Sequence, residues 1–219
     1  MLSKRNKLVL ALPKGRILDE VMPLLRVAGI EPEPDFFDDS ARQLRFATNR
    51  VDLDIVRVRS FDAATFVAFG AAQIGVAGND VLNEFQYDEI YSVLNLNIGK
   101  CRLSVARNKL DKTKNKEESG NFLVATKYKN IVTNHFAKKG IRAECIKLNG
   151  AIELAPKLGI CSAIVDLVST GETLKQNDLK EDEVLLNITS RLIVNKIAYK
   201  VMNDDISIYM KKFEELVNA

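Results

Sequence analysis

Short apolar runs alternate with amphipathic helical patterns along nearly the whole of this 219-residue chain. The first run, Val9 to Leu12, is followed by apolar residues at helical spacing from Ile17 to Ala28, and Gly29 then ends the helix. Such alternation favours a parallel-rich α/β architecture over all-α or all-β units. Because 47% of the residues are hydrophobic, the chain can bury one large core or two small ones.

Further elements are expected in both halves of the chain. In the first half, the pattern predicts paired strands at 44–47 and 53–58, a helix at 62–70, a strand at 74–76 and a helix from residue 79. In the second half, it predicts strands at 123–125, 144–148 and 163–167, with helices near Ile131 and Ile152. A charged loop, 111–120, separates the two series.

Two long extended runs, Tyr91 to Ala106 and Val184 to Val194, divide the chain. Each is a candidate for a strand that crosses from one sheet to another. Two crossings predict a discontinuous domain I of residues 1–97 and 184–219 and an inserted domain II of residues 98–183. The C-terminal helix from residue 204 to 217 would then pack on domain I, and ligands would bind in a cleft at the hinge.

Charge and composition argue against several classes of function. The 32 basic and 29 acidic residues are spread along the chain, without the basic stripe of a nucleic-acid-binding protein. No apolar run reaches the roughly 18 to 20 residues that span a bilayer, and the N-terminus leads directly into a strand, so we expect a cytoplasmic protein with no membrane partner. Three cysteines without metal spacing predict ordinary buried or half-buried thiols. The single histidine, His135, lies away from the motifs below, so catalysis has to rely on fixed charges and backbone dipoles.

The most informative motif begins at Asp166, directly after the apolar run 162–165. Small residues and hydroxyls at a strand-to-helix turn let an anion approach unpaired backbone N–H groups. We therefore expect a phosphate to bind at Ser169, Thr170, Gly171 and Thr173, and sugar hydroxyls to bind at Asp166. Glu172 is expected to form a capping box with Ser169 instead of touching ligand. An ordinary βα turn is the alternative.

Basic residues mark two further segments. Lys14 and Arg16 stand where the first strand meets the first helix, and cations at that positive end favour an anionic ligand. Arg42 and Arg45 follow acidic residues at 35–39, so local salt bridges are a serious alternative to ligand binding there.

Three other turns leave structural and ligand-binding roles open. Arg59 ends a strand before a helix that Asp62 can cap. Gly78 belongs to a Gly-x-x-Gly turn, which is weak by itself. Glu153 lies early in a short helix, where its carboxylate can favour the helix dipole or bind a ribose hydroxyl.

Taken together, six ordered segments resemble the ATP phosphoribosyltransferase family of histidine biosynthesis, in its short catalytic-subunit form. They are Leu10-Ala11-Leu12-Pro13-Lys14-Gly15-Arg16-Ile17 and the segments 75–82, 99–103, 146–156, 166–174 and 190–195. The resemblance covers essentially the whole chain. It implies two α/β domains with a hinge and an interdomain cleft, like those of type II periplasmic binding proteins.

The resemblance also implies an activity and its partners. The expected reaction joins N1 of the adenine of ATP to 5-phosphoribosyl 1-pyrophosphate and releases pyrophosphate. Mg²⁺ is expected to enter with substrate, without metal ligands dedicated to it. A homodimer within a hetero-oligomer is expected, with a regulatory subunit resembling histidyl-tRNA synthetase.

Roles for single residues follow from the same resemblance. The family's phosphate loop corresponds to Asp166 through Thr173, which adds Leu167 and Val168 to the residues above. Glu153 and Asp166 correspond to the carboxylates that bind the ribose diol. Arg16 and Arg42 correspond to catalytic arginines near the leaving pyrophosphate, whereas Lys14, Arg59 and Gly78 are assigned to ATP.

The sequence departs from the family pattern at two places, and two other functions fit parts of it. Residues 61–64 differ from the pattern common in the family, which affects the assignment of Arg59. Leu167 replaces the second acid that begins the loop of salvage-type phosphoribosyltransferases, which argues against that enzyme class. A non-catalytic solute-binding or ligand-sensing domain of the same fold is the competing hypothesis from another class.

Overall fold

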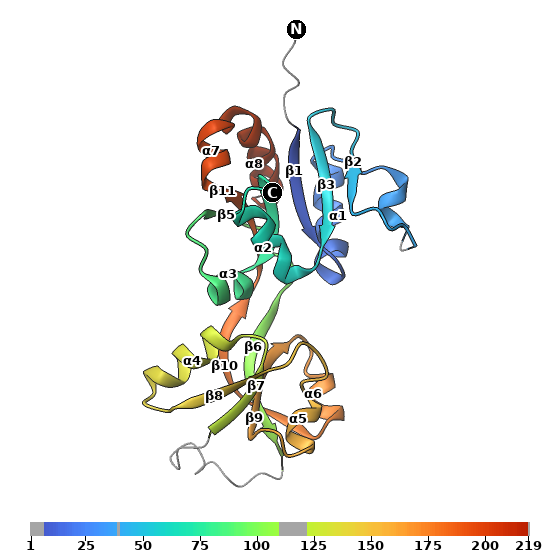
Figure 1. Ribbon diagram of the computed structural model, residues 1–219. Coiled ribbons are helices and arrows are strands. Elements are labelled where there is room, and N and C mark those ends of the chain that lie inside the picture. The colour runs from blue at the N-terminus through green and yellow to red at the C-terminus, as the bar shows by residue number, and fades with distance from the viewer. Residues whose placement is uncertain (1–6, 39, 110–121, 219) are drawn as a thin grey trace. The chain divides into compact units, whose positions relative to one another are not determined.

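The computed structural model describes residues 7–38, 40–109 and 122–218 (Figure 1). The charged loop expected at 111–120 lies outside these ranges. The chain forms two compact units: unit 1 consists of Met1–Leu82, Gln86–Gly99 and Thr189–Ala219, and unit 2 of Asn83–Phe85 and Lys100–Ile188. The chain therefore passes from unit 1 to unit 2 after Gly99 and returns to unit 1 after Ile188. The sequence analysis places these two boundaries after residues 97 and 183.

Unit 1 is built on a six-stranded sheet in the order β2-β3-β1-β4-β11-β5. Its strands are β1 (Leu8–Pro13), β2 (Arg45–Ala47), β3 (Leu53–Val58), β4 (Ile74–Gly78), β5 (Ile90–Asn95) and β11 (Ser190–Asn195). Strand β1 runs parallel to both β3 and β4, and the other pairings are antiparallel. The predicted pairing of the strands now labelled β2 and β3 is confirmed.

Both faces of this sheet are covered. Leu8, Leu10 and Leu12 of β1 face a core that includes apolar residues of helices α1 (Arg16–Val27) and α8 (Asn203–Val217). Val9 and Ala11 face the opposite core, with residues of α2 (Ser60–Ala68) and α3 (Asn79–Phe85). Alternate residues of a strand point to opposite faces of the sheet. Because both faces are buried at β1, all of its residues are apolar.

Unit 2 is built on a five-stranded sheet in the order β10-β6-β9-β7-β8. Its strands are β6 (Cys101–Asn108), β7 (Phe122–Thr126), β8 (Ala143–Lys147), β9 (Ala163–Val168) and β10 (Leu179–Ile188). Strands β7, β8 and β9 are parallel, while β6 is antiparallel to its neighbours β9 and β10. Helix α4 (Lys129–Lys138) lies on one side of the sheet, and α5 (Leu154–Lys157) and α6 (Glu172–Gln176) lie on the other (Figure 1).

Each of the two long extended runs contains two strands of different sheets. The first contains β5 and β6, and the second contains the end of β10 followed by β11. Strand β10 begins at Leu179, before the predicted run, because Lys180, Glu181 and Glu183 pair with β6, with a register shift at Asp182, and none of these charged side chains is fully buried. The short helix α7 (Lys196–Val201) and the 3₁₀ turn Pro34–Phe37 were not expected from the pattern.

The predicted packing of the C-terminal helix on the first domain is confirmed, and it includes a partly buried polar contact. Tyr209 of α8 is 1% exposed, and its hydroxyl donates a hydrogen bond to Oδ2 of Asp52 at 2.9 Å. Burial, together with this carboxylate, raises the pKa of Tyr209 to about 12.

The raised pKa of Tyr209 predicts a loss of stability at high pH. The folded-state pKa lies above the unfolded value of about 10. The protonated hydroxyl therefore stabilises the fold fully below pH ~10, and this stabilisation is lost as the pH rises through about 12. We expect thermal melts between these pH values to show a larger fall in Tm for the wild type than for Tyr209→Phe. Equal falls would contradict the assignment.

Candidate functional site

In unit 1, most of the predicted ligand residues lie at the carboxyl ends of parallel strands. Lys14 and Arg16 follow β1, Arg59 follows β3, and Gly78 ends β4. Because β1 is parallel to both neighbours, these ends lie at the same edge of the sheet. Lys14, Arg16 and Arg59 are exposed there. Gly15 turns the chain between the two basic residues with φ +82°, a conformation that favours glycine.

Arg42 lies at the same edge. It precedes β2, which runs antiparallel to β3, and the N–H of Arg57 donates to the carbonyl of Leu44 at 2.9 Å. The segment before β2 therefore lies beside the carboxyl end of β3. Arg42 is exposed and forms no ion pair with any residue that the structure describes.

Of the acidic residues at 35–39 before Arg42, the two that the structure describes, Asp35 and Asp38, do not pair with Arg45. Arg45 pairs with Asp54 instead, at 2.9 Å. Asp38 accepts hydrogen bonds from the side chain and the backbone N–H of Ser40, which lower the pKa of its carboxyl group. Asp39 lies outside the described residues.

Two residues that the sequence analysis missed hold this edge in place. Arg57 is 5% exposed, stacks over the ring of Phe46 and donates through Nη1 to the carbonyl of Phe36 at 2.8 Å. It thereby anchors the segment that leads to Arg42. Glu20 lies 3.7 Å from Nε of Arg16 and accepts a hydrogen bond from the backbone N–H of Gly99 at 2.7 Å.

The structure corrects the expected cap of helix α2 and shows what surrounds the glycine at position 78. Arg59, not Asp62, occupies the N-cap position of α2, and it makes no side-chain capping bond. The expected cap by Asp62 is therefore wrong, because the helix already begins at Ser60. A Cβ atom at Gly78 would lie 2.0 Å from Oδ1 of the buried Asp80, so a larger residue at position 78 would displace that carboxylate.

In unit 2, the predicted residues gather at the carboxyl edge of the parallel strands β7, β8 and β9. Ser169, Thr170 and Gly171 follow β9, and Glu153 lies on the connection that follows β8. Glu153 is half-buried at the N-cap position of α5. Within the described ranges, its carboxylate accepts no hydrogen bond, so it is available to a ligand.

The start of the predicted phosphate loop belongs to the strand. Residues Asp166, Leu167 and Val168 pair with β6, so the turn itself begins only at Ser169. Val168 is buried in the apolar core on the α5 and α6 side, which leaves only its backbone for ligand contact. Asp166 is half-buried, and its Oδ1 accepts a hydrogen bond from the N–H of Leu167 at 2.9 Å.

The expected capping box between Ser169 and Glu172 is wrong. Helix α6 begins at Glu172, its N-cap residue is Gly171 with φ +83°, and the N–H of Glu172 donates to the hydroxyl of Thr170 at 3.4 Å. The Glu172 carboxylate instead accepts from the amide of Gln176 at 3.2 Å. Because α6 has only five residues, the backbone N–H groups of the turn, and not a long helix dipole, are what this edge offers to an anion. Thr173 is exposed on the first turn of α6.

The described residues contain no group of three His, Cys, Asp or Glu side chains that could hold a metal ion. Asp166 and Glu172 are the carboxylates of the segment 166–173. A single carboxylate at this edge, such as that of Asp166, fits Mg²⁺ that enters with substrate, because Mg²⁺ often binds one or two carboxylates together with substrate phosphates. Over the same described ranges, no helix combines the length and apolar character needed to cross a bilayer.

Comparison with known proteins gives a consistent result. Residues 59–215 match the family model of ATP phosphoribosyltransferase (HisG). An ATP phosphoribosyltransferase of Paramagnetospirillum magneticum is 58% identical over 215 residues, which cover 98% of each chain. The structure is also similar to that of the ATP phosphoribosyl transferase (HisG:HisZ) complex from Thermotoga maritima, with a TM-score of 0.82, 29% identity, and 96% and 98% of the two chains covered.

A more distant structural match concerns the fold alone. A probable amino-acid ABC transporter extracellular-binding protein from Bacillus subtilis superposes with a TM-score of 0.57 at 10% identity, over 97% of this chain and 93% of that protein. The predicted α/β fold of the periplasmic-binding-protein type is therefore confirmed.

The short distance from Gly78 to the Asp80 carboxylate predicts that a larger residue at position 78 lowers stability. We expect Gly78→Ala to lower the free energy of unfolding by roughly 1–3 kcal/mol, because the buried carboxylate has to move. The cost should shrink in an Asp80→Ala background, where the clash is absent. Urea melts measure both values, and Gly150→Ala is the control because a Cβ there meets nothing within 4 Å. An equal cost in both backgrounds would refute the explanation.

Proposed function

Because this chain belongs to the ATP phosphoribosyltransferase family, we propose that the residues gathered at its two sheet edges bind the substrates of that family's reaction. In this reaction, N1 of the adenine of ATP attacks the anomeric carbon of 5-phosphoribosyl 1-pyrophosphate. Pyrophosphate leaves, and the product is N1-(5-phosphoribosyl)-ATP, in the first step of histidine biosynthesis. Membership of this family decides against the solute-binding and salvage-enzyme alternatives.

The edge of unit 2 binds the phosphoribosyl group in this proposal. The 5-phosphate accepts hydrogen bonds from the backbone N–H groups and hydroxyls of Ser169, Thr170, Gly171 and Thr173. The carboxylates of Asp166 and Glu153 accept from the ribose hydroxyls. The observation that carries this assignment is that the turn and both carboxylates occur at one carboxyl edge of three parallel strands. Leu167 and Val168 contribute backbone only, since neither side chain is polar.

The edge of unit 1 binds the leaving group and ATP. Arg16 and Arg42 are catalytic in this proposal, because a guanidinium makes bidentate contacts with phosphate oxygens and neutralises the charge that develops on pyrophosphate. Lys14, Arg59 and the turn at Gly78 bind ATP. The adenine nitrogen already has a lone pair, so the forward step needs no strong base, and catalysis consists of positioning and charge neutralisation.

Magnesium enters with the substrates. When bound, the ion would supply positive charge to the phosphate oxygens, and Asp166 would be a carboxylate ligand to it at the edge of unit 2. The protein's own contribution is to orient the sugar through Asp166 and Glu153 and to neutralise the charge of the pyrophosphate through Arg16 and Arg42.

We also propose a regulatory partner. The Thermotoga maritima structure is that of a HisG:HisZ complex. By analogy, this chain functions in the cytoplasm as a homodimer within a hetero-oligomer, with a regulatory subunit resembling histidyl-tRNA synthetase.

A turnover assay tests the activity directly. The full chain is incubated with ATP, 5-phosphoribosyl 1-pyrophosphate, Mg²⁺ and pyrophosphatase, with and without a candidate regulatory subunit. We expect the absorbance of a modified adenine to appear only when both substrates are present. No product under either condition would refute the proposed activity.

Substitution of the two arginines tests the leaving-group role. We expect Arg16→Ala and Arg42→Ala each to lower kcat by roughly 10²- to 10³-fold, because each removes charge stabilisation that grows in the transition state. The Kd for 5-phosphoribosyl 1-pyrophosphate should change much less. Arg26→Ala is the control, because Arg26 is an exposed arginine about 15 Å further along α1. Unchanged kcat in both variants would remove Arg16 and Arg42 from the catalytic role.

A further inference from the structure

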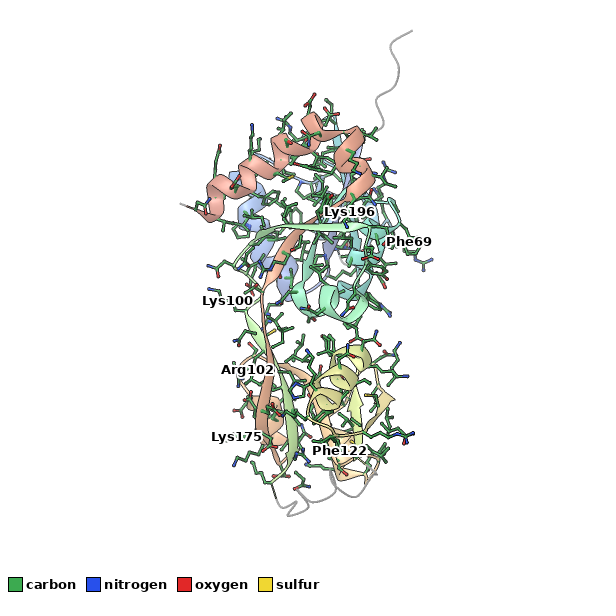
Figure 2. All side chains as sticks on the ribbon, turned by 90° about the vertical axis from the view of Figure 1, so that its left-hand side faces the viewer. Phe69, Lys100, Arg102, Phe122, Lys175 and Lys196 are labelled. Atoms are coloured by element: carbon green, nitrogen blue, oxygen red, sulfur yellow. The ribbon has the colours of Figure 1, made fainter. Side chains whose placement is uncertain are left out.

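Arg102 of β6 makes a set of contacts that none of the roles above explains. Its Nε and Nη2 donate to the two carboxylate oxygens of Glu181 on β10, at 2.5 and 2.6 Å. Its Nη1 donates to the backbone carbonyl of Ser169 at 3.0 Å. Arg102 is labelled in Figure 2, beside the pairing of β6 with β10. One guanidinium thus joins two strands to the turn proposed to bind the 5-phosphate.

Glu181 accepts a further hydrogen bond from a neighbouring residue of β6. The hydroxyl of Ser104, which is completely buried, donates to Oε1 of Glu181 at 2.7 Å. The hydrogen bonds from Arg102 lower the pKa of Glu181, so its carboxylate stays charged at neutral pH. A bidentate pair with these added bonds fixes the plane of the guanidinium and therefore the direction in which Nη1 points.

The bond to Ser169 fixes the orientation of one peptide unit. None of the described peptide bonds is cis, and in a trans peptide the carbonyl and the following N–H point in opposite directions. With the Ser169 carbonyl held toward Arg102, the N–H of Thr170 has to point to the other side of the turn. If that peptide rotated, its carbonyl oxygen would replace the N–H and repel an anion.

We propose that Arg102 and Glu181 form a clamp that positions the phosphate-binding turn, so that Arg102 is a positioning residue and not a direct phosphate ligand. The inference rests on the proposed binding of 5-phosphoribosyl 1-pyrophosphate by this turn. Charge supports the assignment, because the carboxylate of Glu181 neutralises the guanidinium it holds. Gly171 lies against the same guanidinium: a Cβ atom there would be 4.0 Å from Nη2 of Arg102.

The substitutions Arg102→Lys and Glu181→Gln separate a clamp from a direct ligand. Lysine at position 102 keeps the positive charge but lacks the planar guanidinium group. If Arg102 acts as a clamp, Arg102→Lys loses the geometry of the turn, whereas a role that needs charge alone is retained. Glutamine at position 181 weakens the clamp and no longer neutralises the charge of Arg102. If Arg102 bound the phosphate directly, Glu181→Gln would therefore bind it as tightly as the wild type or more tightly. Asp182→Asn is the matched control, because Asp182 pairs with Arg107 across the same two strands at 3.2 Å.

Calorimetric titration of the full-length chain with 5-phosphoribosyl 1-pyrophosphate and Mg²⁺, and separately with ATP, measures the effect. We expect both test variants to raise the Kd for the sugar substrate by on the order of 10- to 100-fold, with the Kd for ATP unchanged. In the ligand-free protein, the amide NMR signal of Thr170 should shift in both variants and stay in place in Asp182→Asn. Thermal melts show whether each variant is folded.

Wild-type affinity in Glu181→Gln, or an unmoved Thr170 signal in both test variants, would overturn the clamp while leaving the proposed function intact. If the wild-type chain did not bind 5-phosphoribosyl 1-pyrophosphate, the proposed function itself would fail. The Thr170 signal would still report whether the clamp orients the turn.

Discussion

Burial of the central strands of the two sheets limits where this chain can carry polar chemistry. All six residues of β1 are buried, and so are four of the six residues of β9. A charged side chain in the middle of either strand would have to enter an apolar core, which is costly without a partner. Most of the candidate ligand residues therefore lie at or just beyond strand ends. Parallel pairing then brings several carboxyl ends to one edge, so the arrangement of the candidate site follows from the packing of the core.

Elements that bury an apolar face could be predicted from periodicity. The strands β1, β3, β7 and β9 and the helices α1 and α8 all carry such a face, and their predicted ranges agree with the structure to within a few residues. The charged start of β10 and the short helix α7 carry no comparable pattern. The capping box failed for a related reason. Val168 still pairs with Arg102 in the sheet, so the chain leaves the strand too late for Ser169 to cap a helix that begins at Glu172.

The candidate site likewise contains segments that the local sequence selects and residues that it does not. Turn composition was enough to select the segments around Arg16, Gly78 and Ser169, because small residues and cations at strand ends form a local pattern. The residues that hold these segments in place could not be identified from the local sequence. Glu20 contacts a backbone amide 79 residues away, and Arg102 contacts a carbonyl 67 residues away. Such contacts depend on the order of strands in a sheet, which no single segment specifies.

Arginine has two different uses in this molecule. Arg57 and Arg102 donate to backbone carbonyls and are held by aromatic rings or by a carboxylate, so their charge is largely compensated within the protein. The cations at the carboxyl edge of unit 1, from Lys14 to Arg59, are exposed at the ends of neighbouring strands. Like charges gathered in this way repel one another in the free protein, and a polyanionic ligand relieves that repulsion when it binds. The compensated arginines thus fix the geometry of the turns, while the exposed ones supply the attraction for phosphate that the proposed reaction requires.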